Sequence, residues 1–315
     1  MSNPPQLAPQ GPGGGASAAS SSTSAATNQA PAVAVMEMKP HSVEDLVHQL
    51  TNPSLREEAL LRLSKIKEGV PELGPLIWNS PGIIAVLLQE IISVYPHLSS
   101  PDLIPAMSNW VANVFTLLQR VATHPDTKIP FLKANIPFYL YPFINTTNKS
   151  KSFGFIRVTS LCVMGELVKG SDPDVIRLLL ETEILQICLH SIEIGGKLSK
   201  KIATFILHRI LQEEFGLEYV CSTEERLISI TRVLGEMVTT KLCEESSHYI
   251  LKLIVQCYIR LSDHPKACES LRQCLPSCFR DASFSRFLGE DLETSKCLQQ
   301  LLHNVLGVAF QAGNE

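Results

Sequence analysis

The chain of 315 residues has few charged side chains, which make up 18% of it, and its first 36 residues have none. This stretch consists of Ala, Ser, Pro, Gly, Gln, Asn and Thr with scattered aliphatic residues. Such a composition cannot bury enough apolar surface to offset the entropy of ordering the backbone. We therefore predict a disordered low-complexity tail at residues 1–38 and a folded domain at residues 39–315.

The same stretch lacks the features of a targeting segment. A secretory signal needs a basic region followed by an apolar core, and a mitochondrial presequence needs Arg. Neither pattern occurs in residues 1–36. No apolar run elsewhere approaches the ~20 residues of a membrane helix, because Gln89 and Glu90 interrupt the best candidate, Ile83 to Val94. We predict a protein of the cytoplasm and the nucleus that makes no contact with a membrane.

An excess of positive charge is also missing, since the formal net charge is −4 and the pI is about 6.2. Bulk attraction to nucleic acid is therefore not expected, although a local basic strip can still attract phosphate groups. Such a strip is formed in the sequence by Lys197, Lys200, Lys201 and Arg209. A module that binds single-stranded nucleic acid in a basic groove is thus the alternative function.

Sequence patterns of catalytic sites are absent as well. The chain has no Gly-x-Ser-x-Gly elbow and no His-Glu-x-x-His zinc motif. Gly195-Gly196-Lys197 lacks both the earlier Gly and the following Ser or Thr that a phosphate-binding loop requires. We predict that the chain is not an enzyme.

The nine cysteines are an odd number and are scattered along the chain. Cys162, Cys188, Cys243 and Cys257 lie in apolar helical patterns, where free Cys behaves as a small buried hydrophobe. Disulfides are not expected in a reducing compartment. Four residues of types that bind zinc lie close together: His264, Cys268, Cys274 and Cys278. They are separated by three, five and three residues in helical sequence, unlike the paired ligands of structural zinc sites. We predict no metal and no cofactor.

What the sequence does contain is a helical repeat. Short polar turns at Pro125, Pro173, Gly216 and Pro265 each separate two segments with helical apolar spacing, at intervals of 48, 43 and 49 residues. A helical period of about 40–47 residues is typical of armadillo and HEAT units, which stack because one unit cannot bury its apolar face alone. No segment alternates with the period of a strand, and Pro142 favours a helix end or turn within Phe138–Phe143. The sequence predicts an all-α solenoid that binds other macromolecules.

The segment from Leu55 to Pro276 resembles the required-for-cell-differentiation family, the armadillo-repeat subunit of the Ccr-Not messenger-RNA deadenylase complex. The resemblance is carried by these stretches: Leu87-Leu-Gln-Glu-Ile91, Phe138-Tyr-Leu-Tyr-Pro-Phe143, Leu178-Leu-Leu-Glu-Thr-Glu-Ile184, Leu198-Ser-Lys-Lys-Ile-Ala-Thr-Phe-Ile-Leu207, Cys257-Tyr-Ile-Arg-Leu-Ser-Asp263 and Leu271-Arg-Gln-Cys-Leu-Pro276. It implies an armadillo solenoid of about six repeats without catalytic activity. It also implies an adaptor that promotes mRNA deadenylation, decay and translational repression, in the cytoplasm, including P-bodies, and in the nucleus.

The resemblance further implies docking on the large NOT scaffold subunit of the complex. The positions that match the family's scaffold-binding surface are Asn79, Pro81, Ala85 and Ile92. Family members often carry His and Phe at the first two of these positions, so the chain departs from the pattern there. Ala85 and Ile92 fit an apolar seam by themselves, because residues seven apart share one face of a helix.

Two more binding sites are implied by the same resemblance. A groove that receives helical peptides of RNA-binding repressors matches Phe155, Cys162 and Ile202, and such grooves accept the apolar face of an amphipathic helix. A pocket for Trp side chains of silencing proteins matches Arg226 and Lys266, with Glu224 where animal members have Tyr. The family is also described as binding single-stranded nucleic acid and as self-associating, which makes a homodimer a further expectation.

Overall fold

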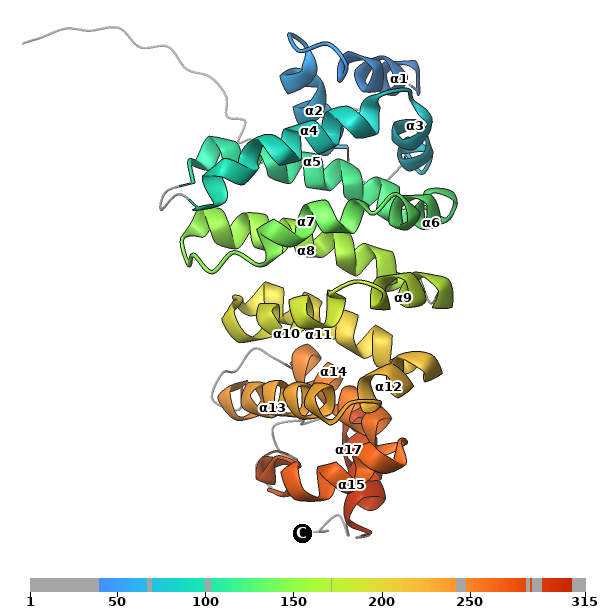
Figure 1. Cartoon of the computed structure of the whole chain (residues 1–315), viewed down its shortest axis with the longest axis vertical. Helices are drawn as coiled ribbons and strands as arrows, with labels where there is room; N and C mark the ends of the chain where they lie inside the picture. Colours follow the sequence, from blue (N-terminus) through green and yellow to red (C-terminus); the bar gives the residue numbers. More distant parts are fainter. Residues whose placement is uncertain are drawn as a thin grey trace, which may run out of the picture. The chain divides into compact units, whose positions relative to one another are not determined.

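The computed structural model describes residues 40–66, 70–99, 103–170, 172–241, 248–281, 284 and 291–307. Across these residues the regular structure is entirely helical, so the all-α prediction is confirmed (Figure 1). The predicted tail at residues 1–38 lies outside the described residues, and the boundary after residue 38 stays a prediction. No single helix in the described part is long and apolar enough to cross a membrane. One pair bent by 89°, Leu73–Asn79 with Ile83–Ser99, reaches that length and composition only when taken together.

The helices form a series of similar units. An N-terminal pair, α1 (Pro40–Gln49) and α2 (Arg56–Ser64), precedes the first three-helix unit, α3 (Leu73–Asn79), α4 (Ile83–Val94) and α5 (Pro105–Thr123), with the 3-10 turn η1 (Tyr95–Ser99) between α4 and α5. The following units are α6 (Pro125–Lys133), α7 (Ile136–Ile144) and α8 (Lys151–Lys169), then α9 (Pro173–Leu180), α10 (Ile184–Ile194) and α11 (Lys197–Gln212). After them come α12 (Glu214–Cys221), α13 (Glu224–Lys241) and α14 (His248–Ser262), and finally α15 (Pro265–Cys274), η2 (Ser277–Arg280) and α17 (Leu292–Leu306).

Corresponding helices of successive units pack on one another. The long third helices α5, α8, α11, α14 and α17 follow each other along the solenoid, and the second helices α4, α7, α10 and α13 form a parallel row (Figure 1). The short first helices α3, α6, α9 and α12 form the third row. The core lies between the rows and contains fully buried rings such as Phe115, Phe143 and Phe153. This arrangement is the stacked solenoid that the period predicted.

Three of the four predicted unit boundaries are correct. Pro125, Pro173 and Pro265 are the first residues of α6, α9 and α15, a position where proline suits a helix because its missing N–H would have no partner there. Gly216 was predicted to lie in a turn, but it lies inside α12. A side chain there is excluded by packing, since a Cβ on Gly216 would lie 2.0 Å from the carbonyl oxygen of Ile210.

Pro142 also differs from its prediction. It lies within α7, which continues to Ile144, and so it marks neither a turn nor the end of the helix. Its side chain is exposed, so the ring faces away from the core. A proline inside a helix removes one backbone hydrogen bond, because it has no N–H to donate. In α7 the missing N–H leaves the carbonyl of Phe138, four residues earlier, without its usual helical donor.

Arginines of the third helices connect neighbouring units. Arg209 of α11 donates its Nε to the carbonyl oxygen of Val168 on α8 at 3.2 Å, and Arg260 of α14 donates to that of Leu211 on α11 at 3.0 Å. Both carbonyls belong to the last turn of the preceding third helix, where they have no partner within the helix. A cation at this end also interacts favourably with the helix dipole. Arg120 of α5 also donates to a carbonyl of a preceding segment, since its Nη2 lies 2.7 Å from the carbonyl oxygen of Ile66, just after α2.

The cysteines follow the prediction in part. Cys188 and Cys257 are fully buried free thiols, and burial raises the pKa of each. Cys162 is only half-buried, and Cys243 lies outside the described residues. Within the described part, no three His, Cys, Asp or Glu residues are placed to hold a metal ion. Of the four residues weighed as zinc ligands, Cys278 is buried and Cys274 is exposed, while His264 lies 3.1 Å from Glu218.

Candidate partner-binding surfaces

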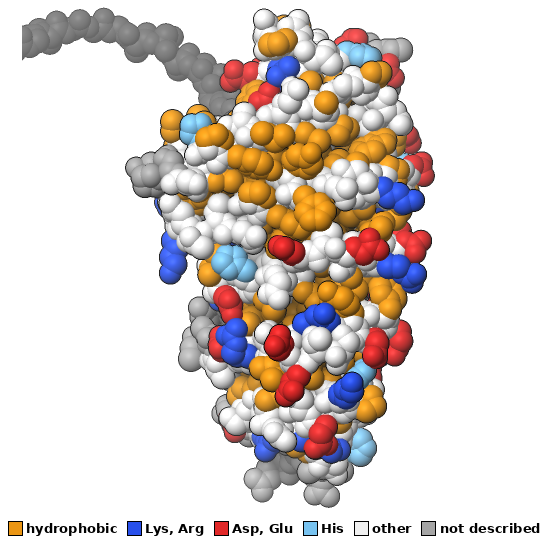
Figure 2. All heavy atoms as spheres, in the orientation of Figure 1, with side chains coloured by type: hydrophobic (Ala, Val, Ile, Leu, Met, Phe, Trp, Pro, Cys, Tyr) orange, Lys and Arg blue, Asp and Glu red, His pale blue; other side chains and the backbone are white. Residues whose placement is uncertain are grey.

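The first surface is the outer face of α4 together with the α3–α4 turn. Ala85 and Ile92 lie exposed on α4, and 44% of Ile92 is accessible. The buried side of the same helix carries Ile83, Leu87 and Ile91. Figure 2 shows hydrophobic side chains gathered over α4 and the neighbouring α7. An apolar face of this kind on the outside of a solenoid indicates a surface that a partner covers.

The turn before α4 brings the other two predicted residues together. Asn79 and Pro81 are both exposed, and both line a hollow of about 390 Å³ whose remaining walls come from Glu72, Pro75, Leu76 and Ser80. Gly82, with a φ of +78°, ends the turn and begins α4. Only glycine adopts this backbone geometry without strain, so it fixes the direction in which α4 leaves the turn. All four predicted scaffold-binding residues therefore lie at the α3–α4 turn and on the outer face of α4.

Sequence reasoning missed the residue that holds α4 in place. The Glu90 carboxylate accepts a hydrogen bond from Arg56 Nη1 of α2 at 2.7 Å and another from Trp110 Nε1 of α5 at 2.8 Å. In the sequence, Glu90 is only the polar residue that breaks an apolar run. Its partners lie 34 and 20 residues away, so no local pattern identifies them.

The second surface lies on the third helices α8 and α11. Phe155 is 45% exposed on α8, and Cys162 follows seven residues later on the same helix. Ile202 of α11 lies against α8, because a Cβ on Gly165 would be 3.1 Å from its Cγ2. Cys162 and Ile202 are both half-buried, so neither is simply a core residue. Burial raises the pKa of the Cys162 thiol to about 11, so the side chain is neutral on this surface.

Two residues that the sequence did not single out extend this surface. Leu198 is 50% exposed near the start of α11, and Tyr249 is 47% exposed near the start of α14. Lys201 Nζ lies 4.4 Å from the centre of the Tyr249 ring, in a cation–π geometry. The available signal was a large apolar residue near the beginning of two successive third helices.

The basic residues do not form one cluster. Lys197, Lys200 and Lys201 lie in the first turns of α11, while Arg209 lies eight residues beyond Lys201, or about 12 Å along the helix axis. Arg209 is bound to the Val168 carbonyl and so has a structural contact. Arg157, also basic, is buried and donates to the carbonyl oxygens of Thr146 and Asn148. The strip that faces solvent is therefore smaller than the sequence suggests.

The third surface lies around the C-terminal end of α12. Arg226 of α13 donates to the Tyr219 carbonyl at 2.5 Å and to Ser222 Oγ at 2.8 Å, and its guanidinium lies 4.1 Å from the centre of the Tyr219 ring. Lys266 in the first turn of α15 lies near Cys221, where its charge partly offsets the burial that raises that thiol's pKa to about 11. The structure thus brings both predicted residues to α12, and it adds Tyr219.

A family model and two yeast proteins match most of this chain in sequence. A family model described as the cell differentiation family, Rcd1-like, matches residues 46–305. The cell differentiation protein rcd1 of Schizosaccharomyces pombe is 46% identical over 271 residues, which cover 86% of this chain and 95% of that protein. Protein CAF40 of Saccharomyces cerevisiae is 43% identical over 269 residues, covering 85% of this chain and 72% of that protein.

Solved structures support the fold. The designed armadillo repeat protein YIII(Dq)4CqI matches with a TM-score of 0.56 at 15% identity, over 84% of this chain and 99% of that one. A related designed armadillo repeat protein, solved in complex with the peptide (KR)4, matches with a TM-score of 0.53 at 16% identity, over 84% of this chain and 99% of that one. At such low identity the similarity concerns the fold alone, and it confirms the armadillo architecture.

Proposed function

Because the chain belongs to the Rcd1-like cell differentiation family, we propose that it is a noncatalytic adaptor subunit of the Ccr-Not deadenylase complex. It docks on the large NOT scaffold subunit and binds short peptides of RNA-associated repressors. In this way it promotes mRNA deadenylation, decay and translational repression. Tethering raises the effective concentration of the nuclease near the poly(A) tail, which requires no catalytic group in the adaptor itself.

The observation that carries this proposal is the exposed apolar face of α4. Ala85 and Ile92 present apolar surface to solvent on a helix whose opposite side is already buried in the solenoid. Asn79 and Pro81 contribute an adjoining hollow at one end of this face. A flat apolar seam that ends in a hollow suits a permanent partner, because obligate interfaces are more hydrophobic than transient ones.

The peptide groove involves a different side of the solenoid. Phe155, Cys162 and Ile202 offer apolar surface on two adjacent third helices, and Leu198 continues it toward the start of α11. An amphipathic helix places apolar anchors at such spacing into a groove of this kind. We assign the Trp pocket to Arg226 and Lys266, with the Tyr219 ring as a further wall. Glu224 is exposed at the first position of α13 and adds a negative charge there.

The test is calorimetric titration of the purified chain with the recombinant NOT scaffold subunit. We expect Ala85→Glu and Ile92→Glu to weaken binding at least tenfold, since a carboxylate is costly to desolvate. Ile202→Glu is the matched control and should retain scaffold affinity while losing a helical repressor peptide. Circular dichroism establishes that each variant is folded. Full scaffold affinity in both α4 variants would contradict the docking surface.

A second function is supported by one contact. Lys201 lies over the exposed Tyr249 ring, and base stacking on an aromatic ring beside cations is how single-stranded nucleic acid is bound without sequence preference. Binding of a fluorescent oligoribonucleotide should then weaken steeply with salt, and Tyr249→Ala should reduce it. Affinity for a repressor peptide should change little over the same salt range. Equal salt dependence of the two ligands would contradict a separate nucleic-acid site.

A further inference from the structure

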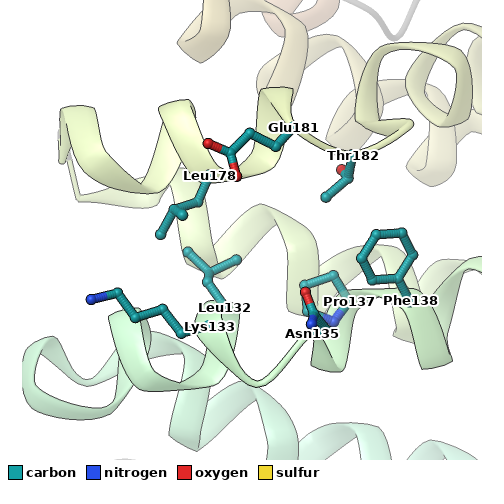
Figure 3. Close-up of a pocket in the computed structure, with 8 residues that line it drawn as sticks. All are labelled: Leu132, Lys133, Asn135, Pro137, Phe138, Leu178, Glu181 and Thr182. Carbon is teal, nitrogen blue, oxygen red and sulfur yellow. The ribbon is translucent and has the colours of Figure 1, made fainter.

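A pocket of about 310 Å³ lies where the α6–α7 turn of one unit meets the α9–α10 turn of the next (Figure 3). It belongs to none of the three surfaces described above. The residues that line it are Leu132, Lys133, Asn135, Pro137, Phe138, Leu178, Glu181 and Thr182. Its volume is at the small end of the range of about 300–1,000 Å³ that ligand pockets span. A pocket of this size accommodates one bulky side chain rather than a whole helix.

Apolar side chains form half of the pocket lining, and the pocket is open to solvent. The side chains of Leu132 of α6 and Leu178 of α9 point toward each other, and Pro137 and Phe138 form the adjoining wall (Figure 3). Leu132 is buried and Leu178 is half-buried, whereas 47% of the Phe138 ring is accessible. An exposed aromatic ring beside a hollow is typical of the anchors found at protein interfaces.

Contacts within α7 and across the boundary to the next unit hold this shape. The Phe138 ring packs edge-on against Tyr141, with 5.6 Å between the ring centres. The Tyr141 hydroxyl lies 2.6 Å from Thr182 Oγ1, and that oxygen also donates to the Leu179 carbonyl. One hydrogen bond, between Tyr141 of α7 and Thr182 after α9, therefore crosses the boundary between the units. A pocket that is already formed requires little ordering when a ligand binds.

The backbone at the rim is fixed as well. Asn135 has a φ of +57°, and among the described residues it is the one non-glycine with a positive φ. Asn tolerates this left-handed conformation better than most residues. Pro137 follows in the first turn of α7, where its ring fixes its own φ. Unusual backbone geometry that the surrounding packing maintains is often found at binding sites.

The two rims carry opposite charge. Lys133 lies at the end of α6, close to the first turn of α7, whose free backbone N–H groups are electropositive. Glu181 follows the last turn of α9, which is the electronegative end of that helix. Both charged side chains are exposed. A ligand with a negative charge near Lys133 and a positive charge near Glu181 would bind in one orientation.

We propose that this pocket binds a short peptide segment of a partner protein by one bulky apolar side chain, Leu, Met or aromatic, inserted between Leu132 and Leu178. An acidic residue of the segment lies toward Lys133 and the start of α7, and a basic residue lies toward Glu181. The chain's own N-terminal stretch does not match this pattern, because residues 1–36 contain no charged side chain. The site is separate from the surfaces of the proposed adaptor function and does not depend on them.

The test is selection of phage-displayed random twelve-residue peptides on the full-length chain, followed by fluorescence polarisation with a synthetic copy of an enriched peptide. We expect enriched peptides to contain one large apolar residue between an acidic and a basic residue. Leu178→Glu and the milder Phe138→Ala should each lower their affinity at least tenfold. The double variant Lys133→Glu with Glu181→Lys should instead prefer the peptide with its two charges exchanged.

Two control variants separate this result from the adaptor function. Ile92→Glu and Ile202→Glu change the α4 face and the groove on α8 and α11, so they should leave the affinity of the selected peptide unchanged. Peptides whose binding is lost in these controls, but retained in Phe138→Ala and in the charge-exchanged variant, would overturn the pocket assignment. A selection that enriches no peptide sensitive to the pocket variants would overturn it as well. Neither outcome bears on the scaffold titration, which is read independently.

Discussion

Glu90 provides a quantitative test of what holds the first units of the solenoid together. Its two carboxylate oxygens join three helices, because they accept hydrogen bonds from Arg56 of α2 and Trp110 of α5 while Glu90 itself lies on α4. The Arg56 and Glu90 side chains are only 19% and 18% exposed, so water screens their ion pair incompletely. Arg56 also donates to the Leu50 carbonyl at 2.8 Å, a contact that does not depend on Glu90.

Replacement of Glu90 by Ala removes both acceptors at once. A polar group left without a partner in a buried position costs about 1–3 kcal/mol, whereas an exposed ion pair contributes only about 0–1 kcal/mol. Both partners are partly accessible, and Arg56 retains its contact with Leu50. We therefore expect Glu90→Ala to lower the free energy of unfolding by about 2–3 kcal/mol, and Glu90→Gln, which keeps one oxygen, by about 1 kcal/mol.

The assay uses the protein's own fluorescence during urea unfolding. The chain has two tryptophans, Trp78 on α3 and Trp110 on α5, so the signal reports on this unit even if the solenoid unfolds in stages. Glu58→Gln, which changes an exposed carboxylate on α2, is the matched control and should remain within about 0.5 kcal/mol of the wild type. Unfolding of Glu90→Ala at the wild-type urea concentration would refute the reasoning.

Three further predictions concern other parts of the chain. In the same urea titration, Gly216→Ala should lower the free energy of unfolding by about 3 kcal/mol, because the new Cβ would meet a backbone carbonyl. The control Gly154→Ala has open space around it and should be neutral or stabilising by up to about 1 kcal/mol. Burial, reinforced by Arg209, lowers the pKa of His208 to about 4, so the unfolded chain binds a proton there that the folded chain does not. Stability should then fall as pH drops from about 6.5 to 4, by at most about 1.4 kcal/mol per pH unit, and urea midpoints of His208→Gln should show a shallower fall. With a pKa of about 11, Cys162 should be only about 0.1% thiolate at pH 8. Peptide-resolved mass spectrometry should therefore show slower alkylation by iodoacetamide at Cys162 than at the exposed Cys274. Equal alkylation rates at the two cysteines would contradict this prediction.

The sequence predicts the architecture well because its signals are local. A proline at the first position of a helix acts through its own backbone, so Pro125, Pro173 and Pro265 mark unit boundaries without knowledge of the fold. Gly216 was misplaced for the opposite reason. Gly216 must lack a side chain because the Ile210 carbonyl of α11 approaches it closely, not because it lies in a turn.

The candidate surfaces were predicted less completely, because their partners are distant in the sequence. Arg209 is one of several basic residues in the sequence, and only the structure shows that the carbonyl of Val168, 41 residues earlier, accepts its hydrogen bond. Tyr219 and Tyr249 are single aromatic residues whose neighbours, Arg226 and Lys201, are defined by helix packing. In the sequence, an exposed apolar residue such as Leu198 cannot be told from a core residue of the same type. Only its accessible surface in the structure distinguishes the two.

The arginine contacts between third helices also affect how such a chain changes length in evolution. At the α8–α11 and α11–α14 boundaries the donor comes from the later helix and the acceptor from the last turn of the earlier one. Loss of the whole α9–α11 unit would therefore place Arg260 opposite Val168, and duplication of that unit would create another copy of the same contact. Units in this stretch can therefore be lost or gained in whole steps without a new kind of junction, whereas an insertion inside one of these third helices would displace the arginine from its carbonyl.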